Sequence, residues 1–121
     1  MSNASAAHQR LVALSVSEMI RQGMTSIRAA GVTGYQQPEP ISGMIPDATG
    51  YHQSRLCIVE AETSEGLTTT HTADQLRVFH REANRVGGHL ILSVSSADKA
   101  KAEVLLRTIT SGAQNSIVWS F

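Results

Sequence analysis

Residues 45–63 read IPDATGYHQSRLCIVEAET, and this stretch decides the fold because it contains two extended segments joined by a short turn. The segments are Asp47–His52 and Arg55–Glu62. The polar pair Gln53-Ser54 lies between them and has the length of a tight hairpin loop. We therefore predict a β-hairpin centred on Gln53-Ser54.

This hairpin predicts a cluster of three acidic side chains. A two-residue loop sets Asp47 opposite Glu60, and directly opposed residues lie on the same face of a sheet. Glu62 lies two residues beyond Glu60 and therefore on that face as well. A loop with an odd number of residues or a bulge would break this register. Carboxylates held this close repel one another unless a cation lies between them, and a hard divalent cation prefers such oxygen ligands. The alternative is a solvated, partly protonated strand end.

The rest of the chain alternates helical and extended patterns. A helical apolar spacing runs from about His8 to Ala30, and residues 34–46 contain all three prolines and read as a loop with one short strand at most. The sequence Thr72-Ala73-Asp74-Gln75 is typical of a capping box that begins a second helix. The remaining predicted elements are a strand at His89–Val94, a helix at about Ala97–Ser111 and a strand at Ile117–Phe121. Strand–helix–strand steps favour parallel pairing, so we predict an α/β fold with a mixed sheet.

Length and composition indicate one globular domain. The chain has 121 residues, of which 41% are hydrophobic and 17% charged. Residues 1–7 are small and polar, and we expect them to be frayed. Ten basic and ten acidic residues cancel, which argues against binding a polyanion through overall charge. One cysteine excludes an intrachain disulfide, and we see neither a secretory signal nor a membrane-length apolar run, so a cytoplasmic protein is expected.

The acidic pattern resembles a known family. Pro46-Asp47, followed after a gap by Glu60-x-Glu62 at the end of an apolar strand, is similar to the motif of the PD-(D/E)XK nuclease superfamily. The resemblance covers most of the chain and implies a restriction-endonuclease-like mixed sheet with helices on both faces. The implied core is α-β-β-β-α-β, with a further helix before the last strand.

One position departs from the family pattern. The third motif residue is usually lysine, and here it is Glu62, as in some restriction enzymes of the superfamily. No lysine lies near in sequence to replace it. An inactive descendant that binds nucleic acid or protein is therefore an open alternative.

Further residues are candidates for the site. The resemblance implies that Glu18, on the first helix, can reach a metal site, although it can also pair with Arg21 on the surface. It also implies a polar residue such as Gln75 near the site, although a capping role explains Gln75 equally well. His71 could contact phosphate or polarise a water molecule, and a loop histidine without a role is the alternative.

An arginine stripe is the candidate surface for nucleic acid. Arg77, Arg81 and Arg85 are spaced four residues apart and share one face of the second helix. Guanidinium groups bind phosphate oxygens bidentately. The alternative is an ordinary solvated face, which the neighbouring Asp74 and Glu82 would balance.

Together these features predict a metal-dependent nuclease that hydrolyses phosphodiester bonds, with DNA the expected substrate. Asp47 and Glu60 are expected to bind Mg²⁺ or Mn²⁺, and Glu62 to complete the ligand set or accept a proton from water. A neutral domain of this size would hold DNA weakly by itself, so we expect a homodimer or a larger complex.

Overall fold

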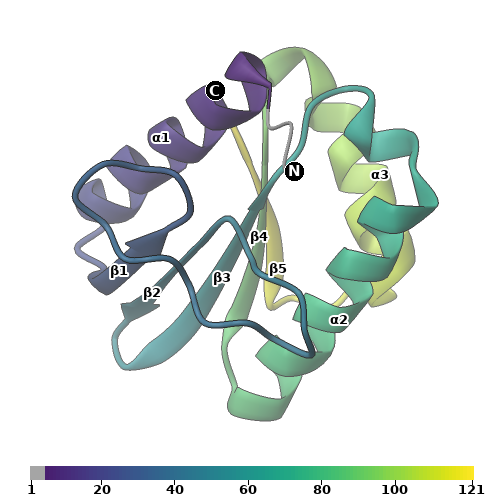
Figure 1. Cartoon of the computed structure of the whole chain (residues 1–121). Helices are drawn as coiled ribbons and strands as arrows, with labels where there is room; N and C mark the ends of the chain where they lie inside the picture. Colours follow the sequence, from purple (N-terminus) through teal and green to yellow (C-terminus); the bar gives the residue numbers. More distant parts are fainter. Residues whose placement is uncertain (1–4) are drawn as a thin grey trace.

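The computed structural model describes residues 5–121, which form three helices and five strands (Figure 1). In chain order they are α1 (Ala6–Arg21), β1 (Thr25–Ala29), β2 (Ala48–His52), β3 (Arg55–Ala61), α2 (Thr70–Val86), β4 (His89–Val94), α3 (Lys99–Thr110) and β5 (Ser116–Ser120). Short 3-10 turns precede α2 and α3, at Gly66–Thr68 and Ser96–Asp98. None of the described helices has the length and apolar character needed to cross a bilayer.

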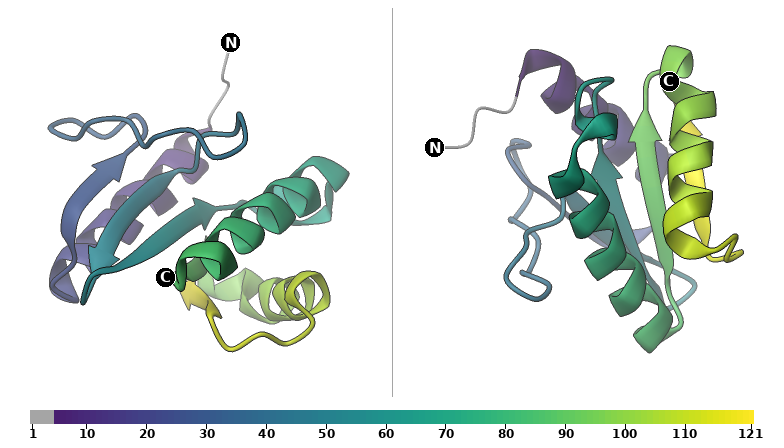
Figure 2. Two further views of the ribbon diagram at one scale, coloured as in Figure 1. Left: turned by 90° about the horizontal axis from the view of Figure 1, so that it is seen from below. Right: turned by 90° about the vertical axis from the view of Figure 1, so that its right-hand side faces the viewer.

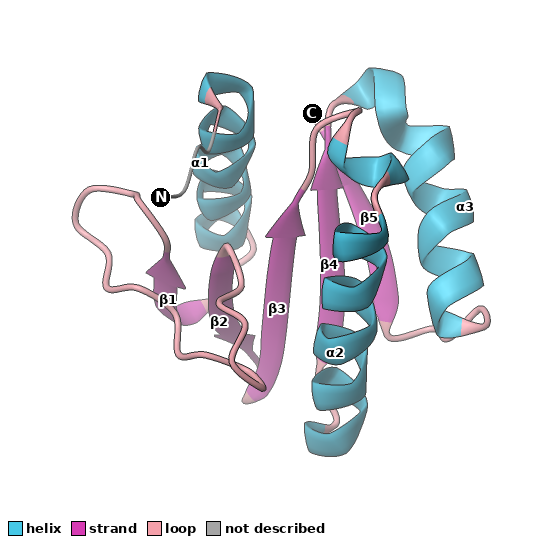
Figure 3. Ribbon diagram, turned by 45° about the vertical axis from the view of Figure 1, so that its right-hand side comes forward, coloured by secondary structure: helices cyan, strands magenta, loops and turns pink. Residues whose placement is uncertain are grey.

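The strands form one open mixed sheet in the order β1-β2-β3-β4-β5. Strands β1, β2 and β3 pair antiparallel, whereas β3, β4 and β5 pair parallel. Helix α1 covers one face of the sheet, and α2 and α3 lie together on the other (Figures 2 and 3). The α/β class and the mixed sheet predicted from the sequence are confirmed.

Alternation along β3 determines which face each side chain occupies. Ile58 is buried against the α2 face, together with Leu76 and Phe79. Cys57 and Val59 are buried on the opposite face, where α1 packs. Because successive strand residues point to opposite faces, the residues that follow Ile58 at even spacing lie on the α2 face. This alternation places both glutamates of the motif on the side of α2.

The predicted first helix was wrong in its extent. It was expected to continue to Ala30, but α1 ends at Arg21, and residues 25–29 form strand β1. Gly23 adopts a left-handed φ of 79°, which breaks the helix although the apolar spacing continues through Met24 and Ile27. At the other end, α1 already includes Ala6 and Ala7, so the expectation of fraying is wrong for residues 5–7, and residues 1–4 lie outside the described part.

The start of α2 also differs from the prediction. Thr69, not Thr72, caps the helix, because the Thr69 hydroxyl accepts a hydrogen bond from the Thr72 N–H at 3.1 Å. Thr72 is a buried residue of the helix, so Gln75 belongs to no capping box. Within residues 34–46 the backbone forms one isolated bridge, between Ile41 and Met44, instead of a strand. Ile41 and Met44 pack against the core on the α2 face.

Candidate metal centre

The hairpin has the predicted register. His52 pairs with Arg55 beside the turn, and Ala48 pairs with Val59 at the far end. Both turn residues, Gln53 and Ser54, have left-handed φ angles of 52° and 68°, as a tight two-residue hairpin turn requires. Asp47 directly precedes β2, and its backbone N–H donates to Glu60 Oε1 at 3.2 Å.

Asp47, Glu60 and Glu62 line one hollow of about 600 Å³ on the α2 side of the sheet. Glu62 follows β3 directly, and its N–H donates to the Ser93 carbonyl at 3.0 Å, so the chain stays extended as it enters the hollow. Among the described residues, the lining includes four carboxylate side chains and neither lysine nor arginine. The lining residues are Ser5, His8, Ile45, Asp47, Glu60, Glu62, Thr63, Glu65, Gly66, Thr69 and Gln75.

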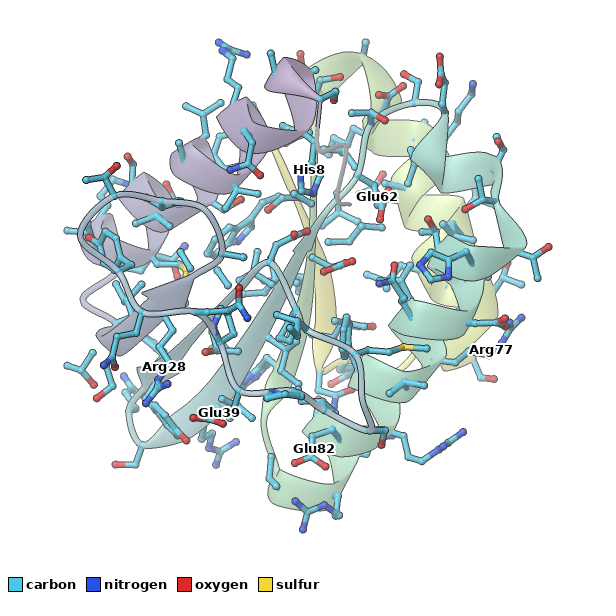
Figure 4. All side chains as sticks on the ribbon, viewed as in Figure 1. His8, Arg28, Glu39, Glu62, Arg77 and Glu82 are labelled. Carbon is cyan, nitrogen blue, oxygen red and sulfur yellow. The ribbon has the colours of Figure 1, made fainter. Side chains whose placement is uncertain are left out.

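Asp47 is held by hydrogen bonds from two elements. Its Oδ2 accepts the Ala61 N–H at 2.8 Å and lies 3.1 Å from His8 Nε2. His8 comes from the first turn of α1, so the hollow is closed by both the hairpin and this helix. Figure 4 shows the His8 and Glu62 side chains near each other between α1 and the segment that leads into α2.

Burial and the charge of Asp47 shift Glu60 and Glu62 toward their protonated forms. Glu60 is 4% exposed, and burial, followed by the charge of Asp47, raises its pKa well above the ordinary glutamate value. Burial, followed by the charge of Asp47, raises the pKa of Glu62 to about 7, although the nearby His8 opposes this shift. The hydrogen bond with Asp47 raises the pKa of His8 despite its burial.

These side chains share a hollow but do not form a ready set of metal ligands. Within residues 5–121, no group of three histidine, cysteine, aspartate or glutamate side chains is arranged to hold a metal ion. One Asp47 oxygen is occupied by His8 and Ala61, and Glu60 accepts the Asp47 N–H. The structure thus brings together the three predicted acids and shows Asp47 and Glu60 hydrogen bonded to the protein.

Of the other predicted site residues Glu18, Gln75 and His71, one lines the hollow and two do not. Gln75 lines the hollow, from the first turns of α2. Glu18 does not line it; the Glu18 carboxylate instead bonds to Arg21 and Gln22 at the other end of α1. The expected reach of Glu18 into the site is therefore wrong, and His8 is the residue of α1 that enters it. His71 is exposed and does not line the hollow.

The arginine stripe lies on the exposed surface of α2 and is largely paired. Arg77 bonds to Asp74 at 3.3 Å, and Arg85 bonds to Glu82 at 2.7 Å. Arg81 is exposed and forms no ion pair with the described residues. In Figure 4, Arg77 points outward from α2, away from His8 and Glu62.

Sequence reasoning missed His8. The histidines of the chain show no spacing typical of metal ligands, and the contact of His8 with Asp47 joins residues 39 positions apart. Such a contact follows only from the packing of α1 on the sheet. The local signal was Ser5, which is a favourable N-cap residue placed three positions before His8.

Comparison of the chain with protein-family models, curated proteins and solved structures finds no match.

Proposed function

We propose that this protein is a metal-dependent hydrolase of phosphodiester bonds with a restriction-endonuclease-like fold of the PD-(D/E)XK superfamily. The observation that carries the proposal is the set of Asp47, Glu60 and Glu62 on one face of one hairpin. They line one hollow whose described lining includes neither lysine nor arginine. Such a concentration of like charge is unfavourable by itself and is relieved by a bound cation.

The arrangement of elements supports the fold part of the proposal. The chain order α1-β1-β2-β3-α2-β4 reproduces the α-β-β-β-α-β core that the resemblance implies, and α3 is the further helix before β5. Helices cover both faces of the sheet. The motif acids lie at the carboxyl end of β3, where it runs parallel to β4. Ligands of open α/β sheets bind at such carboxyl ends.

The donor chemistry of the hollow suits Mg²⁺ or Mn²⁺. Carboxylate oxygens are the ligands that these hard cations prefer, and among residues 5–121 the lining includes no sulfur atom and only one imidazole. The raised pKa values of Glu60 and Glu62 mean that a cation would take the place of protons. Asp47 would also have to present the oxygen that neither His8 nor Ala61 occupies.

In the proposed site, Asp47 and Glu60 hold the cation, and Glu62 either completes the ligand set or accepts a proton from the attacking water. The bound cation would supply Lewis-acid polarisation of the phosphate. A carboxylate beside a divalent cation stays ionised, which suits either role of Glu62. Gln75 lines the α2 wall of the hollow and in this proposal would donate a hydrogen bond to the substrate.

The proposed substrate is nucleic acid, with DNA favoured, and the expected assembly is a homodimer or a larger complex. The described lining has four carboxylates and neither lysine nor arginine, so a polyanion would need the cation to gain a favourable charge there. The net charge of zero supplies no long-range attraction. The remaining affinity for a nucleic-acid substrate would come from local surfaces such as the arginine stripe or from a second subunit.

A second candidate function is an inactive module of the same fold that binds nucleic acid or protein. Two observations favour it: Glu62 stands where the family usually has lysine, and the acids of residues 5–121 do not form a ready set of metal ligands. In this alternative no cation enters the hollow, and the raised pKa values of Glu60 and Glu62 favour their protonated forms.

Calorimetric titration with Mn²⁺ separates the two functions. The wild type and Asp47→Ala are compared at pH 8, where Glu62 is mostly ionised. Glu65→Gln is the matched control, because Glu65 is an exposed acid of the same hollow that lies outside the motif. Binding by the wild type and the control that is lost in Asp47→Ala supports the metal-dependent enzyme. Lack of binding to the wild type at millimolar Mn²⁺ supports the inactive module.

A further inference from the structure

The two edges of the sheet are unequally protected. At the β1 edge, the Ala29 N–H donates to the Gln36 carbonyl at 2.9 Å, so the loop after β1 covers this edge. A bulge also lies in β1, between Thr25 and Arg28. Bulges, charges and covering loops are the usual devices that stop another strand from pairing with an edge. Strand β5 forms the opposite edge (Figure 3), and its sequence SIVWS contains neither a charge nor a proline.

Alternate residues of β5 turn their backbone groups away from the sheet. The Phe121 N–H donates to the Val94 carbonyl at 3.1 Å, so the odd-numbered residues of this segment bond to β4. The backbone groups of the even-numbered residues Ser116, Val118 and Ser120 therefore point to the open side. Among the residues that the structure describes, β5 pairs only with β4, and no loop backbone bonds to these even-numbered residues.

These outward groups are complementary to themselves in an antiparallel pair. When Val118 is set opposite Val118 of a second copy, Ser116 faces Ser120, and each outward N–H meets an outward carbonyl. The same register sets Ile117 opposite Trp119 of the second copy, and such pairs of aromatic and β-branched residues stabilise sheets. Ile117 is 43% exposed in the single chain, so the pairing covers an apolar side chain. A register shifted by two residues would leave an end residue of β5 unpaired.

Helix α3 can be aligned with the centre of this register. The Ser116 hydroxyl donates to Thr110 Oγ1 at 3.2 Å, so the end of α3 lies beside the start of β5. Because α3 connects two parallel strands, it runs in the opposite direction to β5. The step from Ser116 to Val118 spans about 6.6 Å, which is the length of about four helical residues. Leu106 of α3 therefore lies level with Val118, and both pack in the same core cluster.

Two charged residues of α3 lie on either side of this level. Glu103 precedes Leu106 and Arg107 follows it, and both charged residues are exposed and line a hollow of about 550 Å³ beside β5. Neither forms an ion pair with the described residues. A two-fold axis at Val118 reverses α3 in the second copy and brings Glu103 of one copy toward Arg107 of the other. The charges of two copies are thus complementary in the register that the strands require.

We propose that the β5 edge is the surface through which two copies of this chain associate, with β5 pairing antiparallel to β5 about a two-fold axis at Val118. The pairing joins the two sheets into one continuous sheet and places both α3 helices on the same face. An isologous contact of this kind closes on itself and gives a dimer that grows no further. The inference depends on neither the acidic hollow nor a metal ion, so it can fail while the proposed function stands.

Sedimentation equilibrium of the full chain and its variants tests the proposal. We expect the wild type to form a species with twice the mass of the 13.0 kDa chain. Ser120→Pro removes an outward N–H that forms no bond to β4. Because symmetry removes this hydrogen bond twice, the dissociation constant of the dimer should rise about 30-fold. Ser120→Ala keeps the N–H and is the matched control, which should dimerise like the wild type.

A charge exchange on α3 tests the two-fold arrangement separately. Arg107→Glu sets like charges across the axis and should raise the dissociation constant of the dimer about tenfold. The double variant Glu103→Arg/Arg107→Glu exchanges the two charges and should restore the wild-type value. Thermal unfolding confirms that each variant is folded, and the charge exchange alone tests the proposal if Ser120→Pro is not.

The outcomes support or overturn the proposal as follows from the pairing. A wild type that is monomeric at its highest soluble concentration, or that grows beyond a dimer, would overturn it. A dimer that Ser120→Pro leaves unchanged, or that Ser120→Ala weakens equally, would also overturn it, because the proposed contact depends on the backbone N–H. Weakening by Arg107→Glu with recovery in the double variant supports the two-fold axis, and lack of recovery contradicts it.

Discussion

Replacing Glu62 by glutamine should stabilise the metal-free protein at high pH and have little effect at low pH. The pKa of Glu62 is about 7 in the folded chain, against an ordinary value of 4.5. The unfolded chain therefore binds fewer protons than the folded chain between about pH 4.5 and 7. Because the folded chain binds more protons, the free energy of unfolding decreases as the pH rises through this window. Above pH 7, the folded protein carries the full penalty of an ionised Glu62.

The size of this penalty follows from the two pKa values. A gap of about 2.5 pH units, at about 1.36 kcal/mol each, gives an upper bound of about 3.4 kcal/mol. Glu62 is only partly buried, so solvent screening reduces the effect, and we expect about 1–2 kcal/mol. For a domain of this length, that change raises the midpoint of thermal unfolding by roughly 4–8 °C. Glutamine keeps the shape of the side chain and removes its charge.

The assay is thermal unfolding followed by circular dichroism, in EDTA, from pH 5 to pH 8. The midpoint of Glu62→Gln should exceed that of the wild type at pH 8, and the two should converge toward pH 5. Glu65→Gln, which removes an exposed charge at the same hollow, should leave the pH dependence unchanged. A Glu62→Gln variant less stable than the wild type at pH 8 would refute the reasoning, because it would mean that protein donors stabilise the ionised carboxylate.

Three further predictions concern the metal, the arginine stripe and the turn. Mn²⁺ at 100 times its Kd should stabilise the wild type by about 2.7 kcal/mol. Glu60→Gln should raise the unfolding midpoint of the metal-free protein and abolish the response to Mn²⁺. A Glu60→Gln variant that is less stable than the wild type in EDTA would argue against repulsion between the three carboxylates. If the arginine stripe contacts phosphates, Arg77→Ala/Arg81→Ala should lower the salt slope of affinity for a mixed-sequence duplex by about 2, and an unchanged slope would make the stripe an ordinary solvated face. Ser54→Gly should relieve the left-handed φ of 68° and raise the unfolding midpoint by a few degrees without changing Mn²⁺ affinity; a lower midpoint would contradict this explanation.

Local sequence patterns predicted the part of the structure that depends on local geometry. The register of β2 and β3 followed from the length of the Gln53-Ser54 loop, because side chains alternate strictly along a strand. The apolar run at His89–Val94 is a strand buried on both faces, as its composition indicated. The three acids consequently lie in one hollow, where the register placed them.

The predictions from sequence were wrong where two local signals competed or where tertiary packing determined the structure. Apolar spacing favoured helix through Ile27, but the left-handed backbone of Gly23 allowed the chain to reverse and add strand β1. Thr69 and Thr72 are both acceptable caps, and burial of Thr72 selected Thr69. The contact between His8 and Asp47 depends on how α1 lies across the sheet, which periodicity in a single segment does not encode.

The two-residue turn at Gln53-Ser54 also determines which changes of length the hairpin tolerates. Adding or removing one residue there, with the strands still paired beside the turn, would rotate every side chain of one strand to the opposite face. Asp47 would then project toward α1 and Glu60 toward α2, with the sheet between them. Adding two residues restores the facing and lengthens only the exposed tip. The number of residues in this turn must therefore remain even for the acids to share a face, so a remote and exposed loop limits which insertions and deletions the site can survive.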